Sequence, residues 1–296
     1  MNIRNWQNAL RISQWKKQIL IWLPIIALGD SITLDNLFRL FWVSLAFSLL
    51  ASCVYLYNDI QDLEEDKLDS YKKQRPLASG KISVSQIKVL APILLILSLS
   101  LTFVASQETS RAIIFMLIFV YFSSNIIYSG LKLKKHRVIG LAIVASGFSI
   151  RFAIGTYTLD LDYSIWALVL IAQLSMFMLS GKRFQNVLRN REDSMVKNLD
   201  AELQFWLLSM VTFAAFFAAT YSGFISDPSV IVIWGKQALI FSTLPLGIGL
   251  VRYVEIVTHP DKFRLSDATE NMTKDPMLIM LVVLYMFALF VGRLTV

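Results

Sequence analysis

Long apolar runs separated by short polar connections repeat along nearly the whole chain. A helix that crosses a bilayer core of about 30 Å needs roughly 17 to 25 predominantly apolar residues. Runs of that length lie near residues 17–34, 38–60, 85–104, 111–129, 138–158, 163–181, 203–224, 232–252 and 276–295. The pattern predicts an all-α, polytopic membrane protein whose nine transmembrane helices form a single domain over residues 1–296.

Composition agrees with that interpretation. Of the 296 residues, 56% are hydrophobic and only 17% are charged, which excludes an ordinary soluble domain. The first apolar run follows a polar, Trp-containing segment, Asn2 to Lys17, and has no small-residue cleavage site. We therefore expect that run to be retained and not removed as a signal peptide.

Basic residues are concentrated on one side of the predicted membrane. Nearly all Lys and Arg residues lie in the N-terminal segment and in alternate connections, near residues 4–17, 67–88, 132–137, 182–197 and 262–274. The opposite side has only Arg39, Arg111, Lys236 and Arg293. The positive-inside rule predicts that the basic side is cytoplasmic, in a multi-pass protein of the inner membrane. This topology and anionic lipid headgroups account for most of the net charge of +7, so we expect no nucleic-acid partner.

A polar stretch, NDIQDLEED over residues 58–66, directly follows the apolar run from Phe41 to Tyr57. If the helix continues, Asp59, Asp62 and Asp66 follow i, i+3, i+7 spacing and share one face, where their charges repel. Mg²⁺ is usually held by one or two carboxylates together with substrate phosphates, and it removes that repulsion. The stretch predicts a Mg²⁺ site that binds a diphosphate on the cytoplasmic side. The alternative is a solvated acidic helix end.

Three basic residues lie inside or at the ends of apolar runs. Arg151 falls within one run, and Lys182 with Arg183 ends another. A buried cation in a membrane is costly unless it faces a polar cavity or a partner. Lys182 and Arg183 can reach the interface along their own stems, whereas for Arg151 we expect a phosphate or carboxylate partner.

These residues resemble the UbiA superfamily of intramembrane prenyltransferases. NDIQDLEED followed by KKQRPLASG, residues 72–80, is similar to that superfamily's first signature, NDxxDxxxD followed by RP and a Gly. The resemblance covers nearly the whole chain and extends to QWKK at 14–17, Tyr128-Ser129 followed by Lys132 or Lys134, Arg151 with Gly155, and GKR at 181–183. These features are most like the decaprenyl-phosphate phosphoribosyltransferase branch.

The resemblance implies transfer of 5-phosphoribose from phosphoribosyl diphosphate (PRPP) to a polyprenyl phosphate, with release of diphosphate. Prenyl-transferring members carry a second Asp-rich motif after the sixth helix, but residues 181–200 here read GKRFQNVLRNREDSMVKNLD, without DxxxD. Such a basic loop suits the additional 5-phosphate of PRPP. The chain departs from the branch at Gly140 and Asn186, where an acidic residue is common, so the metal site there is open to question.

The resemblance also assigns roles to individual residues. It places Mg²⁺ on Asp59, Asp62 and Asp66, with Asp59 and Asp62 catalytic through stabilisation of the leaving diphosphate. The lipid phosphate is already anionic, so the reaction needs no strong general base. Lys182 and Arg183 are expected to hold the 5-phosphate and Arg151 the lipid phosphate. The remaining expected substrate-binding residues are Lys17, Asn58, Lys72, Lys73, Arg75, Tyr128 and Lys134.

Two other functions remain open. A conventional prenyltransferase joins a prenyl diphosphate to an aromatic or other lipophilic acceptor, and it predicts a second carboxylate cluster. A transporter or lipid-binding protein predicts ionisable residues or helix breaks near the membrane midplane. No pattern in the sequence specifies the lipid chain length or the oligomeric state.

Overall fold

The computed structural model describes residues 3–69, 72–133, 136–161, 164–189, 199–259 and 274–295. Within these ranges the chain is helical and contains no strand. Eight of its helices are long and apolar enough to cross a membrane. The predicted all-α, polytopic membrane class is confirmed.

The chain divides into two compact units, Met1–Tyr163 and Ser164–Val296. Each is described here by itself. The prediction of one domain over residues 1–296 stays a prediction.

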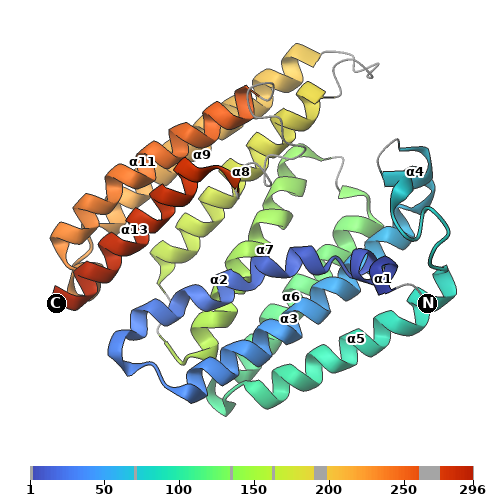
Figure 1. The fold of residues 1–296 in the computed structure, drawn as a ribbon, viewed down its shortest axis with the longest axis horizontal. Coiled ribbons are helices and arrows are strands. Elements are labelled where there is room, and N and C mark those ends of the chain that lie inside the picture. The colour runs from blue at the N-terminus through green and yellow to red at the C-terminus, as the bar shows by residue number, and fades with distance from the viewer. Residues whose placement is uncertain are drawn as a thin grey trace. The chain divides into compact units, whose positions relative to one another are not determined.

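The first unit is built around two helices that are more buried than their neighbours (Figure 1). These are α3 (Leu34–Gln61) and α7 (Arg137–Thr158). Helix α5 (Val84–Ala105) packs along α3, while α6 (Glu108–Gly130) packs against both α3 and α7. Outward-facing apolar side chains on α5 and α6, such as Val104 and Phe119, are 74% and 68% exposed, as expected of lipid-facing positions. The central helices therefore carry polar residues that lipid does not reach.

The first predicted span is helical but not one long helix. It contains the end of η1 (Ile12–Gln18), the four-residue α2 (Ile19–Trp22) and η2 (Leu23–Ser31), which has a left-handed residue, Gly29, at φ 54°. Before it lies α1 (Ile3–Ala9). The described residues thus form eight long spans and one broken helical segment, whereas the sequence predicts nine transmembrane helices.

In its described residues, the second unit contains α8 (Ile165–Arg189), α9 (Leu199–Phe224), α10 (Pro228–Trp234), α11 (Lys236–Thr258) and α13 (Pro276–Thr295). Helices α8 and α9 form one closely packed pair, and α11 and α13 form another. A hydrogen bond from Gln173 Nε2 to Thr220 Oγ1 at 2.9 Å links α8 to α9 within their apolar interface. Polar bonds of this kind contribute to helix association in lipid.

A close backbone approach holds the broken segment against α7. A Cβ atom added to Gly155 would lie 2.0 Å from the carbonyl oxygen of Ile21, which is fully buried. Only a residue without a side chain allows this contact, and small residues bring helices together in this way in membranes. Gly155 therefore sets the position of the N-terminal segment on the first unit.

We predict that Gly155→Ala destabilises the protein by about 1 to 3 kcal/mol or more, because the added methyl group has no room and the backbones must separate. Thermal unfolding in detergent micelles measures the effect. Gly247→Ala, inside α11, is the matched control, since a Cβ there meets nothing within 4 Å. Equal melting temperatures for the two variants would contradict the prediction.

Candidate active site

The acidic stretch lies where α3 ends and a second helix begins. Helix α3 stops at Gln61, Asp62 leaves the α-helical region (φ −93°, ψ 2°), and α4 (Leu63–Leu68) follows. The expectation of one continuing helix is therefore wrong. Backbone bonds from Asp62 N to Asn58 O and from Asp66 N to Asp62 O, at 2.9 and 2.8 Å, still hold the two helices in tandem.

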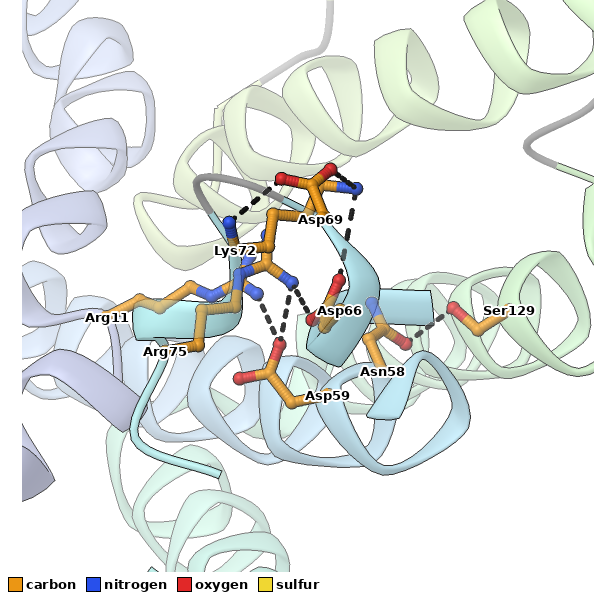
Figure 2. Close-up of polar contacts among 8 residues, drawn as sticks. All are labelled: Arg11, Asn58, Asp59, Asp66, Asp69, Lys72, Arg75 and Ser129. Atoms are coloured by element: carbon orange, nitrogen blue, oxygen red, sulfur yellow. Dashed lines mark hydrogen bonds and ion pairs between the residues drawn. The ribbon is translucent and has the colours of Figure 1, made fainter. Parts of the chain in front are cut away.

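Arg75 bridges the first and last aspartates of the motif, as Figure 2 shows. Its Nη1 lies 2.6 Å from Asp66 Oδ2 and 3.4 Å from Asp59 Oδ1. Asp59 and Asp66 are only 5% and 2% exposed. Because both carboxylates contact one nitrogen, they are neighbours. Asp62, between them in the sequence, is half-buried.

A second guanidinium reaches the pair from the N-terminal segment. Arg11 Nη2 donates to Asp59 Oδ1 at 2.5 Å (Figure 2). The guanidinium carbon of Arg11 lies 4.5 Å from the centre of the Tyr55 ring. Arg11 has a left-handed backbone, φ 50° and ψ 48°. The sequence interpretation missed this residue, since one Arg among several in a polar N-terminal segment carries no signal of its direction.

Other predicted residues surround the cluster. Lys72 Nζ lies 3.5 Å from Asp69 Oδ2 and 3.9 Å from Asp66 Oδ1. Asn58 Oδ1 accepts a hydrogen bond from Ser129 Oγ at 2.6 Å, which joins the ends of α3 and α6 (Figure 2).

The last predicted residues of the first unit are more scattered. Lys73 is exposed in η3 (Lys72–Gln74), and Tyr128 is half-buried on α6. Lys17 Nζ lies 5.7 Å from the centre of the Phe148 ring. Lys134 lies outside the described residues.

The carboxylates of the cluster offer oxygen ligands to a divalent metal. In the described part of the chain, no three His, Cys, Asp or Glu side chains gather closely enough to hold a metal ion by themselves. Asp59 and Asp66 form a two-carboxylate pair, and Asp66 Oδ1 is a buried oxygen that receives no hydrogen bond. Hard oxygen donors from one or two carboxylates, completed by substrate phosphates, are the usual environment of Mg²⁺. The pair fits such a shared site but not a metal site built from protein alone.

Arg151 is enclosed by neutral groups. It is 4% exposed, and its Nε, Nη1 and Nη2 donate to Gln18 Oε1, Gly147 O and Tyr121 OH at 2.9, 2.5 and 3.5 Å. The ring of Phe47 lies 4.7 Å from its guanidinium carbon. Among the described residues no carboxylate pairs with Arg151, and its expected phosphate partner stays a prediction. These contacts favour a role in holding η1, α6 and α7 together.

Lys182 and Arg183 belong to the second unit, near the end of α8, where Lys182 is half-buried and Arg183 exposed. Gly181, just before them, allows a close contact with Tyr253 of α11: an added Cβ would lie 2.7 Å from the Tyr253 ring. Tyr253 OH donates to Met178 O at 2.6 Å. Tyr253 therefore fixes the turn of α8 that carries both cations.

Both positions at which the chain departs from the expected family pattern, Gly140 and Asn186, lie in described helices. Gly140 is buried in the first turn of α7, and Asn186 is exposed on α8. Much of the basic loop after Arg189, including Arg191 and Lys197, lies outside the described residues.

Comparison with known proteins decides the family. The model of the UbiA prenyltransferase family matches residues 20–273. The chain belongs to the UbiA prenyltransferase family. It is therefore an integral membrane transferase, in agreement with its eight apolar helices.

Individual relatives of this UbiA family member are more specific. The decaprenyl-phosphate phosphoribosyltransferase of Corynebacterium glutamicum is 31% identical over 279 residues, covering 88% of this chain and 80% of that protein. The enzyme of the same name from Mycobacterium tuberculosis is 32% identical over 180 residues, covering 60% of this chain and 58% of that protein. A solved UbiA homolog from Archaeoglobus fulgidus, bound to DMAPP and Mg²⁺, has a TM-score of 0.68 at 15% identity, covering 99% of this chain and 100% of that one. The last comparison supports the fold.

We predict that Arg151→Ala lowers the stability of the protein by about 2 to 5 kcal/mol, because it leaves a cavity. It also removes the side-chain hydrogen bonds to Gln18 Oε1, Gly147 O and Tyr121 OH. Arg151→Lys is expected to cost about 1 to 3 kcal/mol, since one ammonium cannot reach all three acceptors.

Melting temperature and substrate use of both variants test this prediction. Arg39→Ala is the control, because Arg39 makes only a surface ion pair with Asp35, worth about 0 to 1 kcal/mol. A variant of Arg151 with normal stability but poor substrate use would instead place the guanidinium on a substrate phosphate.

Proposed function

We propose that this protein transfers 5-phosphoribose from PRPP to a polyprenyl phosphate at the cytoplasmic face of the membrane. The observation that carries the proposal is the 31% identity, over most of both chains, to a decaprenyl-phosphate phosphoribosyltransferase. The basic GKR sequence at residues 181–183, in place of a second Asp-rich motif, supports the same donor. Transfer forms a bond between ribose C1 and a lipid phosphate oxygen and breaks the bond between C1 and the diphosphate.

The diphosphate of the donor is the group that the cluster of Asp59, Asp66, Arg11 and Arg75 suits. Asp59 and Asp66, with Asp62, would hold Mg²⁺, and the bound ion would supply Lewis-acid stabilisation of the charge on the leaving diphosphate. Arg75 already stands between the two carboxylates and offers a planar donor fork to phosphate oxygens. The neighbouring Lys72 and Lys73 add positive charge at the same end of the unit.

The remaining phosphate groups of the two substrates are assigned to residues by charge and hydrogen-bonding capacity. Lys182 and Arg183 would bind the 5-phosphate, which only the phosphoribosyl donor carries. Asn58, whose side-chain oxygen accepts from Ser129, keeps its amide NH₂ as a donor beside the carboxylates. Lys17 and Tyr128 would contact the substrate phosphates, as would Lys134. Arg151 would act on the lipid phosphate either directly or through the segment that it holds in place.

We expect Asp59→Asn and Asp66→Asn to keep the fold but to lower turnover at least about 100-fold, because metal-assisted stabilisation of the leaving group supplies several kcal/mol. Asp62→Asn tests the third carboxylate in the same assay. Glu64→Gln is the control, since it removes an exposed charge on α4 that pairs with Lys67. Full activity in EDTA would contradict the metal requirement.

The donor is tested directly. Purified protein with ribose-labelled PRPP and a polyprenyl phosphate should transfer the label to a lipid-extractable product, whereas a prenyl diphosphate with 4-hydroxybenzoate should give no product. The reverse result would establish the conventional prenyltransferase. Absence of any transfer with either pair, together with substrate binding, would favour the lipid-binding alternative.

A further inference from the structure

Both buried carboxylates of the cluster are already paired with guanidinium groups of the protein. Asp59 contacts Arg11 and Arg75, and Asp66 contacts Arg75. Lys72 Nζ also lies 3.9 Å from Asp66 Oδ1, so three cations surround the two buried carboxylates. A divalent cation that binds these oxygens therefore meets positive charge already beside them.

The backbone that carries Arg11 is held in place beside the carboxylates. Ser52 Oγ donates to the carbonyl oxygen of Leu10 at 2.8 Å and lies 3.1 Å from Trp15 Nε1, which donates to it. These bonds fix the chain on both sides of Arg11 against α3. The left-handed backbone of Arg11 is rare for a residue with a side chain, and the contact with Tyr55 further orients its guanidinium.

The electrostatics differ between a divalent cation that binds alone and one that binds together with a diphosphate. A divalent cation alone must displace Arg11 from Asp59 or share the carboxylate with it, and like charges in a buried site repel strongly. A diphosphate changes this balance, because its oxygens give the displaced guanidinium a new acceptor of matching geometry. The buried oxygen Asp66 Oδ1, which receives no hydrogen bond, remains available to the cation.

We propose that the cluster admits a divalent cation and a diphosphate together and disfavours the cation alone, and that Arg11 couples the two by moving from Asp59 to the diphosphate. This inference rests on the metal and diphosphate parts of the proposed function, and it is independent of which group the diphosphate carries. Arg11 is thereby a substrate-binding residue that also competes with the metal.

The test measures binding of Mn²⁺, as a spectroscopic substitute for Mg²⁺, to the full-length protein in detergent micelles with and without inorganic pyrophosphate. Arg11→Gln should bind Mn²⁺ alone more tightly than the unaltered protein does. Between linked sites, coupling typically changes affinity about 5-fold to 150-fold, and reciprocally. We therefore expect Mn²⁺ to strengthen binding of labelled pyrophosphate about 5-fold or more in the unaltered protein and less in Arg11→Gln.

Two further variants make the comparison specific. Lys16→Gln removes one positive charge from the same segment at an exposed position and should behave like the unaltered protein. Arg11→Lys keeps the charge without the planar fork and should give intermediate Mn²⁺ affinity. The Mn²⁺–pyrophosphate complex that forms in solution is common to all samples, so differences between variants report on the protein.

The outcomes separate this inference from the proposed function. If Arg11→Gln binds Mn²⁺ alone no better than the unaltered protein, with both melting normally, the competition is overturned. If Arg11→Gln does not fold, Arg11→Lys and the coupling in the unaltered protein still decide the matter, and absence of coupling overturns the inference. A failure to use PRPP, with coupling intact, would refute the donor and leave the role of Arg11 standing.

Discussion

Two carboxylates buried at the end of a membrane helix are the constraint on which the first unit depends. Burying a charge without a partner is costly, and removing the partner of a buried ion is strongly destabilising. Asp59 and Asp66 obtain their partners from chain segments on either side: Arg11 comes before α3, and Arg75 follows α4. Both segments must therefore fold back onto the same helix end. The two buried carboxylates thus account both for the local charge balance and for the path of the two flanking segments.

The N-terminal segment that brings in Arg11 is held at two places by contacts of different kinds. At one place, Ser52 of α3 bonds to Leu10 and Trp15 through hydrogen bonds. At the other, the bare backbone of Gly155 on α7 admits the Ile21 carbonyl at close range. Arg151, one turn before Gly155, adds a bond to Gln18 between these places. Contacts with α7 thus help to fix the N-terminal segment whose Arg11 pairs with Asp59.

Hydrophobic run length predicts most of this fold, because membrane spans require long apolar stretches whatever their tertiary contacts. It could not show that residues 17–34 form a broken segment, since that depends on packing and on the left-handed Gly29. The acidic motif and the Arg of RP likewise indicate the cluster, and Arg75 does join Asp59 to Asp66. The break at Asp62 and the direction of Arg11 depend on single backbone conformations, which the pattern of residue types does not specify.

The cluster also limits what can distinguish one donor from another. Phosphoribosyl and prenyl donors share a diphosphate, which is the part that the cluster is proposed to bind. Discrimination must come from residues that meet the remainder of the donor, and an additional phosphate requires cations held in fixed positions. On α8, the close packing of Gly181 against Tyr253 fixes the turn that carries Lys182 and Arg183. Under the proposed function, the choice of donor is therefore a property to test on α8, whereas the carboxylate cluster would bind the diphosphate that both donors share.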